Sequence, residues 1–405
     1  VPIANVMNDY FHACGRGGLG AVMGSKMLKA IVVRGDKKPG IADEDAFRKA
    51  RRDALRLIKA GPVASKGLST YGTSAMVNLM NYLKILPADN FRKTEFRSAD
   101  RISGESIRES YEFKSHTCYN CVIACKHIIK SGALAGYEIP EYETLWAYGP
   151  GCNNADLETI IKVNRMCNDY GIDTISSGST IAAYAEIMGS DIKEFSELVK
   201  KTGEKEGIGE ELGRGSKVLS DLHGKNVGMH AKGLELPGYD PRGLLGMALA
   251  YATSNRGGCH LRAYMAAPEV LGKPKKVDRL TFSGKAGLVQ FFQNEMAALD
   301  SLVLCKFASF AVSEVEFANI LRAATGVDYS TEEFLRCGER TWNLERLFNI
   351  KAGFSRKDDT LPERFFGKSG IDRAEFERAL EEYYQFRGWD ENGVPAENKL
   401  EELGL

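Results

Sequence analysis

Three cysteines close together constrain the fold of this chain more than any other feature. They form the pattern Cys118-x-x-Cys121-x-x-x-Cys125, and three thiolates this close can bind one face of a compact metal centre. A cubane 4Fe–4S cluster takes four thiolates, and the fourth can come from a distant part of the chain. Cys305, which ends the segment Asp300-Ser-Leu-Val-Leu-Cys305, is the natural candidate.

Zinc is the main alternative for this cysteine cluster. Structural zinc sites usually pair two Cys-x-x-Cys knuckles, or one knuckle with two spaced histidines. This chain has one knuckle, and His127 follows Cys125 so closely that it would crowd the site. The spacing favours iron–sulfur but leaves zinc open. Three other cysteines lie in helical patterns and are predicted to be core residues: Cys152, Cys167 and Cys337.

The composition excludes several classes of function. Lys+Arg and Asp+Glu both number 54, a balance that argues against nucleic acid or an anionic membrane as the main partner. No apolar run approaches the roughly 20 residues of a membrane helix. The nine cysteines are an odd count, which does not indicate a disulfide framework. We therefore expect a protein of the reducing cytoplasm with metal-binding thiols.

Helical periodicity dominates from residue 41 to the C-terminus. A chain of 405 residues is too long for one ordinary core. Residues 27–35 are predicted to form a short strand, and a domain junction is expected near residues 223–228. The fold is therefore predicted to be mainly α with a β remnant at the N-terminus. Helices are predicted to begin at residue 43 and over residues 156–171, 180–189, 284–300, 315–323, 331–348 and 373–387.

Two segments have a similar form, Asn168–Asp173 and Asp300–Cys305. A carboxylate can accept two parallel hydrogen bonds from an N–C–N edge, and the amino-pyrimidine part of a pterin carries such an edge. The short spacing to Cys305 favours a functional role for Asp300. For Asp169, an ordinary capping or turn position is the favoured interpretation.

Five longer motifs resemble the aldehyde:ferredoxin oxidoreductase family, in the same order along essentially the whole chain. The resemblance implies that this chain spans the C-terminal two-thirds of such an enzyme, and the absence of an initial Met fits that expectation. The motifs are Gly15–Lys26, Gly136–Thr144, Asp240–Gly243, Thr253–Arg262 and Arg356–Phe365.

The resemblance also implies a domain organisation and two cofactors. Residues 1–38 would be the tail of a β-rich base domain that binds two pterin dithiolenes holding tungsten or molybdenum. Two multi-helical domains would follow, residues 39–228 with the three clustered cysteines and residues 229–405 with the fourth. The resemblance also implies which residues would contact these cofactors. The cluster ligands would be Cys118, Cys121, Cys125 and Cys305, and the pterin contacts Cys14, Gly15, Arg16, Asn168, Asp173, Asp300 and Leu304.

Two departures from the family pattern stand out. The first pterin motif often begins with Asp, but here it begins with Asn168, which loses the charge-assisted fork. Some members carry a Glu-x-x-His that joins two subunits through a metal. Lys162 and Arg165 occupy those positions here, so a homodimer, if formed, would lack the bridging metal.

The family reaction oxidises an aldehyde to a carboxylate with water and passes two electrons to ferredoxin. Glu143 would act as the general base, and His260 would hydrogen-bond the substrate and relay the proton. Two alternatives stay open. One is a related tungsten enzyme with another substrate, such as an aromatic acyl-CoA that is reduced. The other is an iron–sulfur electron-transfer protein without an active site of its own.

Overall fold

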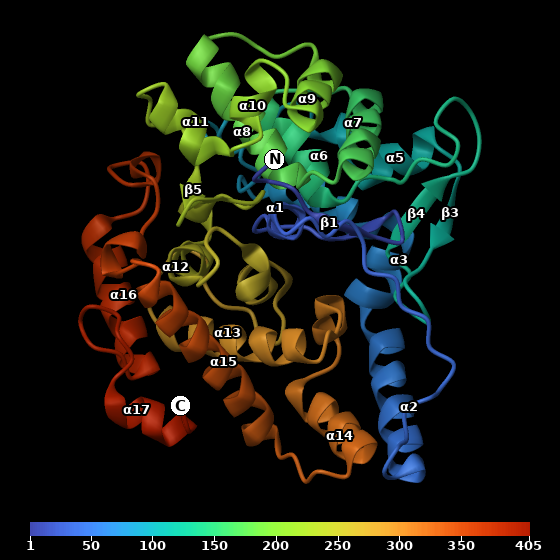
Figure 1. Cartoon of the computed structure of the whole chain (residues 1–405), viewed down its shortest axis with the longest axis vertical. Coiled ribbons are helices and arrows are strands. Elements are labelled where there is room, and N and C mark those ends of the chain that lie inside the picture. Colours follow the sequence, from blue (N-terminus) through green and yellow to red (C-terminus); the bar gives the residue numbers. More distant parts are fainter.

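The computed structural model describes all residues, 1–405, and it confirms a mainly α fold. Seventeen α-helices are accompanied by three two-stranded antiparallel sheets. In Figure 1 the N-terminal segment with β1 and α1 lies between an upper group of helices, α6 to α11, and a lower group that includes α12, α13 and α15 to α17. The N-terminal segment is therefore placed to contact both groups.

The strands are β1 (Val6–Asn8), β2 (His12–Cys14), β3 (Phe113–His116), β4 (Lys126–Ile129), β5 (His230–Ala231) and β6 (Leu234–Glu235). The first nine helices are α1 (Leu19–Ser25), α2 (Glu44–Ala60), α3 (Ser69–Tyr71), α4 (Met76–Tyr82), α5 (Gly104–Ser110), α6 (Tyr142–Tyr148), α7 (Leu157–Tyr170), α8 (Thr174–Met188) and α9 (Phe195–Glu204). The others are α10 (Ile208–Leu212), α11 (Ser216–Leu222), α12 (Leu245–Thr253), α13 (Lys285–Ser301), α14 (Glu314–Thr325), α15 (Thr331–Lys351), α16 (Arg373–Arg387) and α17 (Glu397–Leu403).

Local end signals explain why the predicted helices lie where they do. Asp156 caps α7 by accepting hydrogen bonds from the second and third residues of the helix, and Gly171 ends it at a φ of 66°. The helix expected over residues 180–189 is α8, which begins earlier, at Thr174. The cause is Asp173, whose side chain accepts from the N–H of Ile175 and so starts the helix there.

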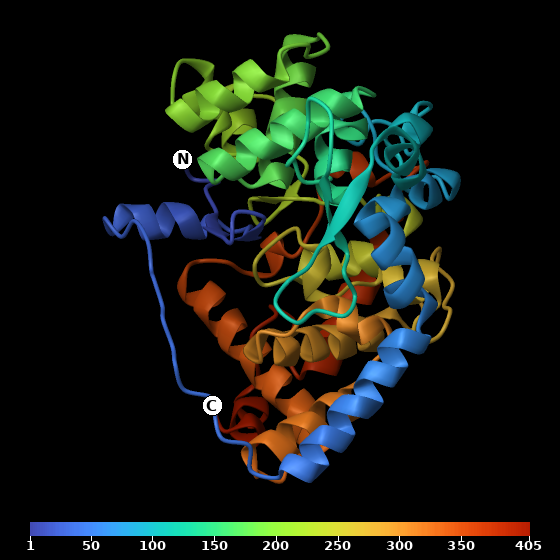
Figure 2. The same cartoon turned by 90° about the vertical axis from the view of Figure 1, so that its right-hand side faces the viewer.

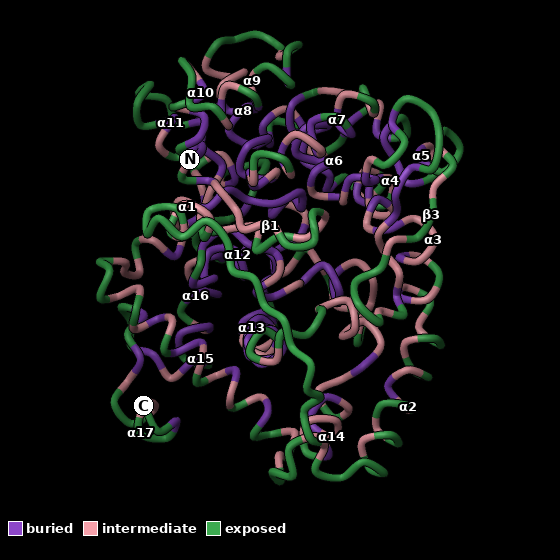
Figure 3. Tube along the Cα trace, turned by 45° about the vertical axis from the view of Figure 1, so that its right-hand side comes forward, coloured by how far each residue is buried: buried purple, intermediate pink, exposed green.

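The strand predicted over residues 27–35 does not form. Residues 28–41 run as an extended segment along the outside of the molecule, from α1 to α2 (Figure 2), and the trace is exposed over this stretch (Figure 3). Val32 is 92% exposed. A strand needs a neighbour to pair its backbone groups, and none of the three sheets offers one here.

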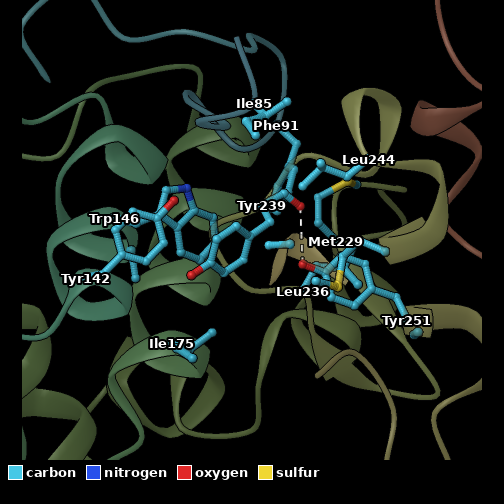
Figure 4. Close-up of a cluster of buried hydrophobic side chains, with 14 of the residues drawn as sticks. Ile85, Phe91, Tyr142, Trp146, Ile175, Met229, Leu236, Tyr239, Leu244 and Tyr251 are labelled. Atoms are coloured by element: carbon cyan, nitrogen blue, oxygen red, sulfur yellow. Dashed lines mark hydrogen bonds between the residues drawn. The ribbon is translucent and has the colours of Figure 1, made fainter. Parts of the chain in front are cut away.

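One continuous core joins the two predicted helical domains. It contains 64 buried residues, from Ile3 to Trp389. Figure 4 shows part of it, where Tyr142 and Trp146 of α6 face Tyr239 and Tyr251. Helix α2 packs instead against α14, and its Ala54 belongs to a smaller hydrophobic cluster that also contains residues of α13. A domain division near residue 228 stays a prediction.

No helix combines the length and apolar character that crossing a bilayer requires.

Candidate functional site

The three clustered cysteines lie on the loop that joins β3 to β4. These strands pair antiparallel, with His116 opposite Lys126, so the two ends of the loop are held together. The backbone turns sharply within the loop, where Asn120 and Ala124 have φ angles of 54° and 55°. The N–H of Cys121 donates to the carbonyl of Cys118 at 3.0 Å. The loop is thus a compact series of turns without regular secondary structure.

Cys305 comes to this loop from the end of α13. Burial raises the pKa of Cys125 to about 12, and the neighbouring Glu141, Cys305 and Cys121 contribute to the rise. Burial is also the main cause that raises the pKa of Cys305, with contributions from Cys121 and Cys118. Phe307 and Phe310, which follow Cys305 in the chain, pack in the same hydrophobic cluster as Cys121 and Cys125, so Cys305 lies near the cysteine loop.

The donor set has the number and kind of ligands that a 4Fe–4S cluster takes. A cubane binds four thiolates, one at each iron corner, and these can come from separate parts of the chain. Here three cysteines lie on the β3–β4 loop and the fourth follows α13. No three His, Cys, Asp or Glu side chains are gathered closely enough to hold a single metal ion.

A buried charged network lies directly behind the cysteine loop. The ammonium of Lys126 contacts the carboxylate of Glu138 and lies 3.0 Å from that of Glu141. Burial alone would lower the pKa of Lys126, but Glu141 and Glu138 raise it overall. The amide Nδ2 of Asn168 donates to Glu138 Oε2 at 3.4 Å. An aspartate at position 168 would face Glu138 with a like charge, which gives the departure from the family pattern a physical reason.

Arg16 is the residue that ties the N-terminal segment to both groups of helices. Its Nε donates to Asp173 Oδ2 at 3.2 Å, and both side chains are less than 10% exposed. Its two terminal nitrogens donate to the carbonyls of Gly258, at 2.6 Å, and Glu235, at 2.7 Å. Arg16 and Asp173 are thus brought together. Cys14 is exposed, and Gly15 has open space around it.

A polar cavity of about 250 Å³ opens beside Asp173. Its lining combines three cationic side chains, two carboxylates and glycine backbone, which suits a polar group better than an apolar one. This is the character expected of a pocket for the polar end of a pterin cofactor. The charged lining residues are Asp173, Arg214, Lys232, Glu235 and Arg256.

Asp300 and Leu304 lie at the end of α13, away from this cavity's lining. The Asp300 carboxylate pairs with Arg262 at 3.2 Å and with Lys306 at 2.8 Å. Leu304 follows a turn in which Val303 has a φ of 54°, and its side chain is 40% exposed. Asp169 instead pairs with Arg165 on the surface, which agrees with a local role.

Glu143 and His260 face each other in the buried interior. Glu143 is in the first turn of α6, and His260 begins the short helix η6 (His260–Arg262). Glu143 Oε2 accepts from the N–H of Gly238 at 2.9 Å, while Oε1 has no hydrogen bond and lies 3.6 Å from His260 Nε2. Nδ1 of His260 is also buried without a partner. Unpartnered buried polar atoms are costly, so water or a bound group between these two side chains would be stabilised by both.

Burial shifts the pKa values of this pair in opposite directions. It raises the pKa of Glu143 to about 8, against the lowering effects of the Gly238 N–H and Arg16. It lowers the pKa of His260 well below its usual value, and the positive charges of Arg16 and Arg256 lower it further. The carboxyl group can therefore hold or release a proton near neutral pH, while the imidazole stays neutral.

Aromatic side chains surround His260. The ring of Tyr239 lies 5.6 Å from the imidazole and that of Tyr264 lies 6.0 Å from it, while the two hydroxyls are 3.0 Å apart. The ring of Phe310 lies 5.8 Å from Tyr264, and Phe310 packs in the cluster that contains Cys121. A series of packed aromatic side chains thus extends from the Glu143–His260 pair toward the cysteine loop.

Sequence reasoning missed some of these residues. Lys126 and Tyr239 belong to no recognisable sequence motif. Their roles depend on which side chains the fold packs against them. Cys259 is fully buried, and its sulfur accepts from Arg256 at 2.8 Å. The pKa of Cys259 is lowered, because Arg256 and Arg16 outweigh the effect of burial. The sequence places Cys259 beside a glycine loop, which left its role open.

Comparisons with known proteins match the whole chain to one family. Residues 1–35 match the model of the N-terminal domain of aldehyde ferredoxin oxidoreductase, and residues 49–405 match the model of domains 2 and 3. The tungsten-containing aldehyde ferredoxin oxidoreductase of Pyrococcus furiosus is 40% identical over 431 residues, covering 100% of this chain and 71% of that protein. The corresponding enzyme of Thermococcus kodakarensis is also 40% identical, with the same coverage of both chains.

Two more distant similarities were found, one in sequence and one in fold alone. The WOR-like subunit of an aliphatic sulfonate oxidoreductase of Pyrococcus furiosus is 27% identical, covering 100% of this chain and 68% of that protein. Among solved structures, the active-site complex BamBC of benzoyl coenzyme A reductase, in complex with 1,5-dienoyl-CoA, superposes with a TM-score of 0.82. It is 20% identical over 100% of this chain and 71% of that chain, a likeness of fold alone.

Proposed function

Since this chain belongs to the aldehyde ferredoxin oxidoreductase family, we propose that it oxidises aldehydes to carboxylates and passes the electrons through a 4Fe–4S cluster to ferredoxin. An aldehyde and water give a carboxylate, two electrons and three protons. The observation that carries the proposal is the buried pair of Glu143 and His260, in which both facing groups retain unpartnered atoms. Such atoms are available to water and substrate.

The cofactor sites follow from the residues described above. Cys118, Cys121, Cys125 and Cys305 would hold the cluster. The tungsten–pterin group of the family supplies the two-electron redox chemistry when it is bound. The residues proposed to contact one pterin are Arg16, Asn168 and Asp173, and those proposed for the other are Asp300 and Leu304.

The chain's own residues would handle the protons. The Glu143 carboxylate accepts a proton from water or from the aldehyde hydrate through Oε1, while the Gly238 N–H holds Oε2 in place. Neutral His260 donates a hydrogen bond from one ring nitrogen and accepts at the other, and so orients the substrate oxygen. The aromatic rings of Tyr239 and Tyr264 keep bulk water away from the pair.

The first prediction tests the general base. We expect Glu143→Gln to lower kcat/KM for an aldehyde by about 10²- to 10⁴-fold, because the amide cannot accept the proton. The measurement is anaerobic aldehyde oxidation by the full-length enzyme with reduced-ferredoxin detection, beside tungsten, iron and sulfide analysis. Glu158→Gln is the matched control, because Glu158 forms only an exposed pair with Lys162.

Three outcomes separate the alternatives. Full activity of Glu143→Gln with intact metal content would remove Glu143 from the mechanism. Activity of the unmodified enzyme on benzoyl-CoA but not on any aldehyde would replace the substrate class. A protein that contains iron and sulfide but neither activity nor tungsten would favour simple electron transfer.

A further inference from the structure

The tip of the β1–β2 hairpin reaches from the N-terminal segment onto the cysteine loop. Asp9 and Tyr10 have φ angles of 51° and 69°, a region that bulky residues rarely adopt. Such backbone persists where the surroundings compensate for its cost. Here the Tyr10 hydroxyl donates to Asp169 at 2.5 Å, and the Arg165 guanidinium lies 4.5 Å from the Tyr10 ring. Helix α7 therefore anchors the tip.

The anchored hairpin brings His12 to the first of the clustered cysteines. His12 begins β2 and pairs with Asn8 of β1, so the hairpin register fixes its position. The ring of Phe11 makes an edge contact with His116, with centroids 4.9 Å apart. His12 Nε2 then lies 3.1 Å from the sulfur of Cys118, within hydrogen-bond distance for sulfur.

This contact differs from those of the other three thiols. Among the hydrogen bonds of the chain, His12 is the one side chain bonded to any of the four sulfurs. A thiolate bound to iron carries no proton, so a close contact between the two groups is favourable only when Nε2 bears the hydrogen.

We propose that His12 donates a hydrogen bond from Nε2 to the Cys118 thiolate and thereby raises the reduction potential of the 4Fe–4S cluster. This inference rests on the proposed function, because it requires the cluster. Reduction adds an electron whose charge spreads onto the thiolates. A donor aimed at one thiolate stabilises the more negative, reduced cluster more than the oxidised one, and hydrogen bonds to sulfur are a known determinant of cluster potential.

The proposal gives the N-terminal segment a function in electron transfer. His12 belongs to the segment that also carries Arg16, whereas the cysteines belong to the helical part. The hairpin would therefore set how readily the cluster accepts the electrons released by aldehyde oxidation. His12 acts here as a positioning and tuning residue, not as a ligand.

The test is a redox titration of the anaerobically purified full-length holoenzyme, followed by the electron paramagnetic resonance signal of the reduced cluster. We expect His12→Ala to shift the midpoint potential to a lower value. His12→Gln should return the potential toward that of the unmodified enzyme, since its amide nitrogen stands where Nε2 stood and still donates. His223→Ala, which removes a histidine paired with Glu211 on the surface, should leave the potential unchanged.

Each outcome decides one question. An unchanged potential in His12→Ala overturns the inference. Equal shifts in His12→Ala and His12→Gln also overturn it, because the N–H would then not be the cause. Loss of iron and sulfide from His12→Ala alone would show that the residue maintains the cluster and does not tune it, which overturns the inference as well. An unmodified enzyme without iron and sulfide would contradict the proposed function itself.

Discussion

At the scale of single residues, the interior of this protein changes the acid–base properties of one carboxyl group. Glu143 has one hydrogen bond, from the Gly238 N–H, and no cation in direct contact. Its pKa of about 8 reflects burial more than any neighbouring charge. A base with a raised pKa binds a proton more strongly, which suits proton removal from water near neutral pH.

The second prediction concerns the pH dependence that this carboxyl group should impose. The deprotonated form of Glu143 is the base, so kcat/KM should rise with pH and level off above an apparent pKa of about 8. We expect no second inflection of the kcat/KM profile near neutral pH from His260, because its pKa is well below the ordinary value. The measurement is kcat/KM from pH 6 to 10, and a flat profile over that range would contradict the assignment.

The raised pKa of Glu143 also makes the free energy of unfolding depend on pH. A carboxyl whose folded pKa is raised binds more protons in the folded state than in the unfolded state. The free energy of unfolding therefore falls as pH rises from the ordinary value of about 4.5 to about 8. Glu143 is thus retained at the expense of stability, as expected for a residue with a chemical role.

At the scale of elements, the crossing of α13 and α15 depends on one glycine. Helices α13 and α15 cross where Gly338 meets the backbone of α13, and a Cβ at this position would lie 1.8 Å from the carbonyl oxygen of Asn294. Helix α13 leads to Asp300 and Cys305, so this crossing sets the position of both residues. Side chains any larger would separate the helices.

The third prediction follows from this contact. Gly338→Ala should lower the free energy of unfolding by about 3 kcal/mol or more, because the added carbon overlaps backbone that cannot move independently. Gly24→Ala, in the open helix α1, is the control and should be neutral or slightly stabilising. Thermal unfolding of the two variants gives the comparison. Equal melting temperatures of the two variants would mean that α13 and α15 can move apart without a loss of stability.

At the scale of the whole molecule, a buried charged cluster joins segments far apart in sequence. Asp359 lies 2.7 Å from the Lys232 ammonium and 2.9 Å from an Arg346 nitrogen, and it accepts from the Tyr384 hydroxyl at 2.5 Å. Lys232, Arg346 and Asp359 are almost completely buried. The turn between β5 and β6 is thereby fixed to α15 and α16. Lys232 also lines the polar cavity beside Asp173, so this cluster shapes one wall of that cavity.

The fourth prediction removes the carboxylate at the centre of this cluster. Asp359→Asn should cost about 3–5 kcal/mol, because Lys232 and Arg346 would be left as buried cations without a counter-charge. Asp53→Asn, at an exposed pair with Arg56, should change stability by less than about 1 kcal/mol. Chemical denaturation measures both. A small effect at Asp359 would indicate that water reaches the cluster and solvates the cations.

Sequence reasoning succeeded where a signal is local. Helix ends such as Asp156 and Gly171 were readable because capping depends on residues within one turn. Residues 27–35 were wrongly predicted as a strand, because their apolar character said nothing about a partner strand. The start of α8 was also misplaced, since the capping side chain of Asp173 was assigned only to a cofactor.

The sequence by itself determined the helical class, the family and the identity of the chemical groups, because spacing and long collinear motifs are properties of the chain alone. Tertiary structure decided which groups meet. Cys305 joins the cysteine loop, His12 reaches Cys118, and Glu143 faces His260 across 3.6 Å. Distances between remote residues, and the burial that shifts their pKa values, exist only after the chain has packed, so no local pattern encodes them.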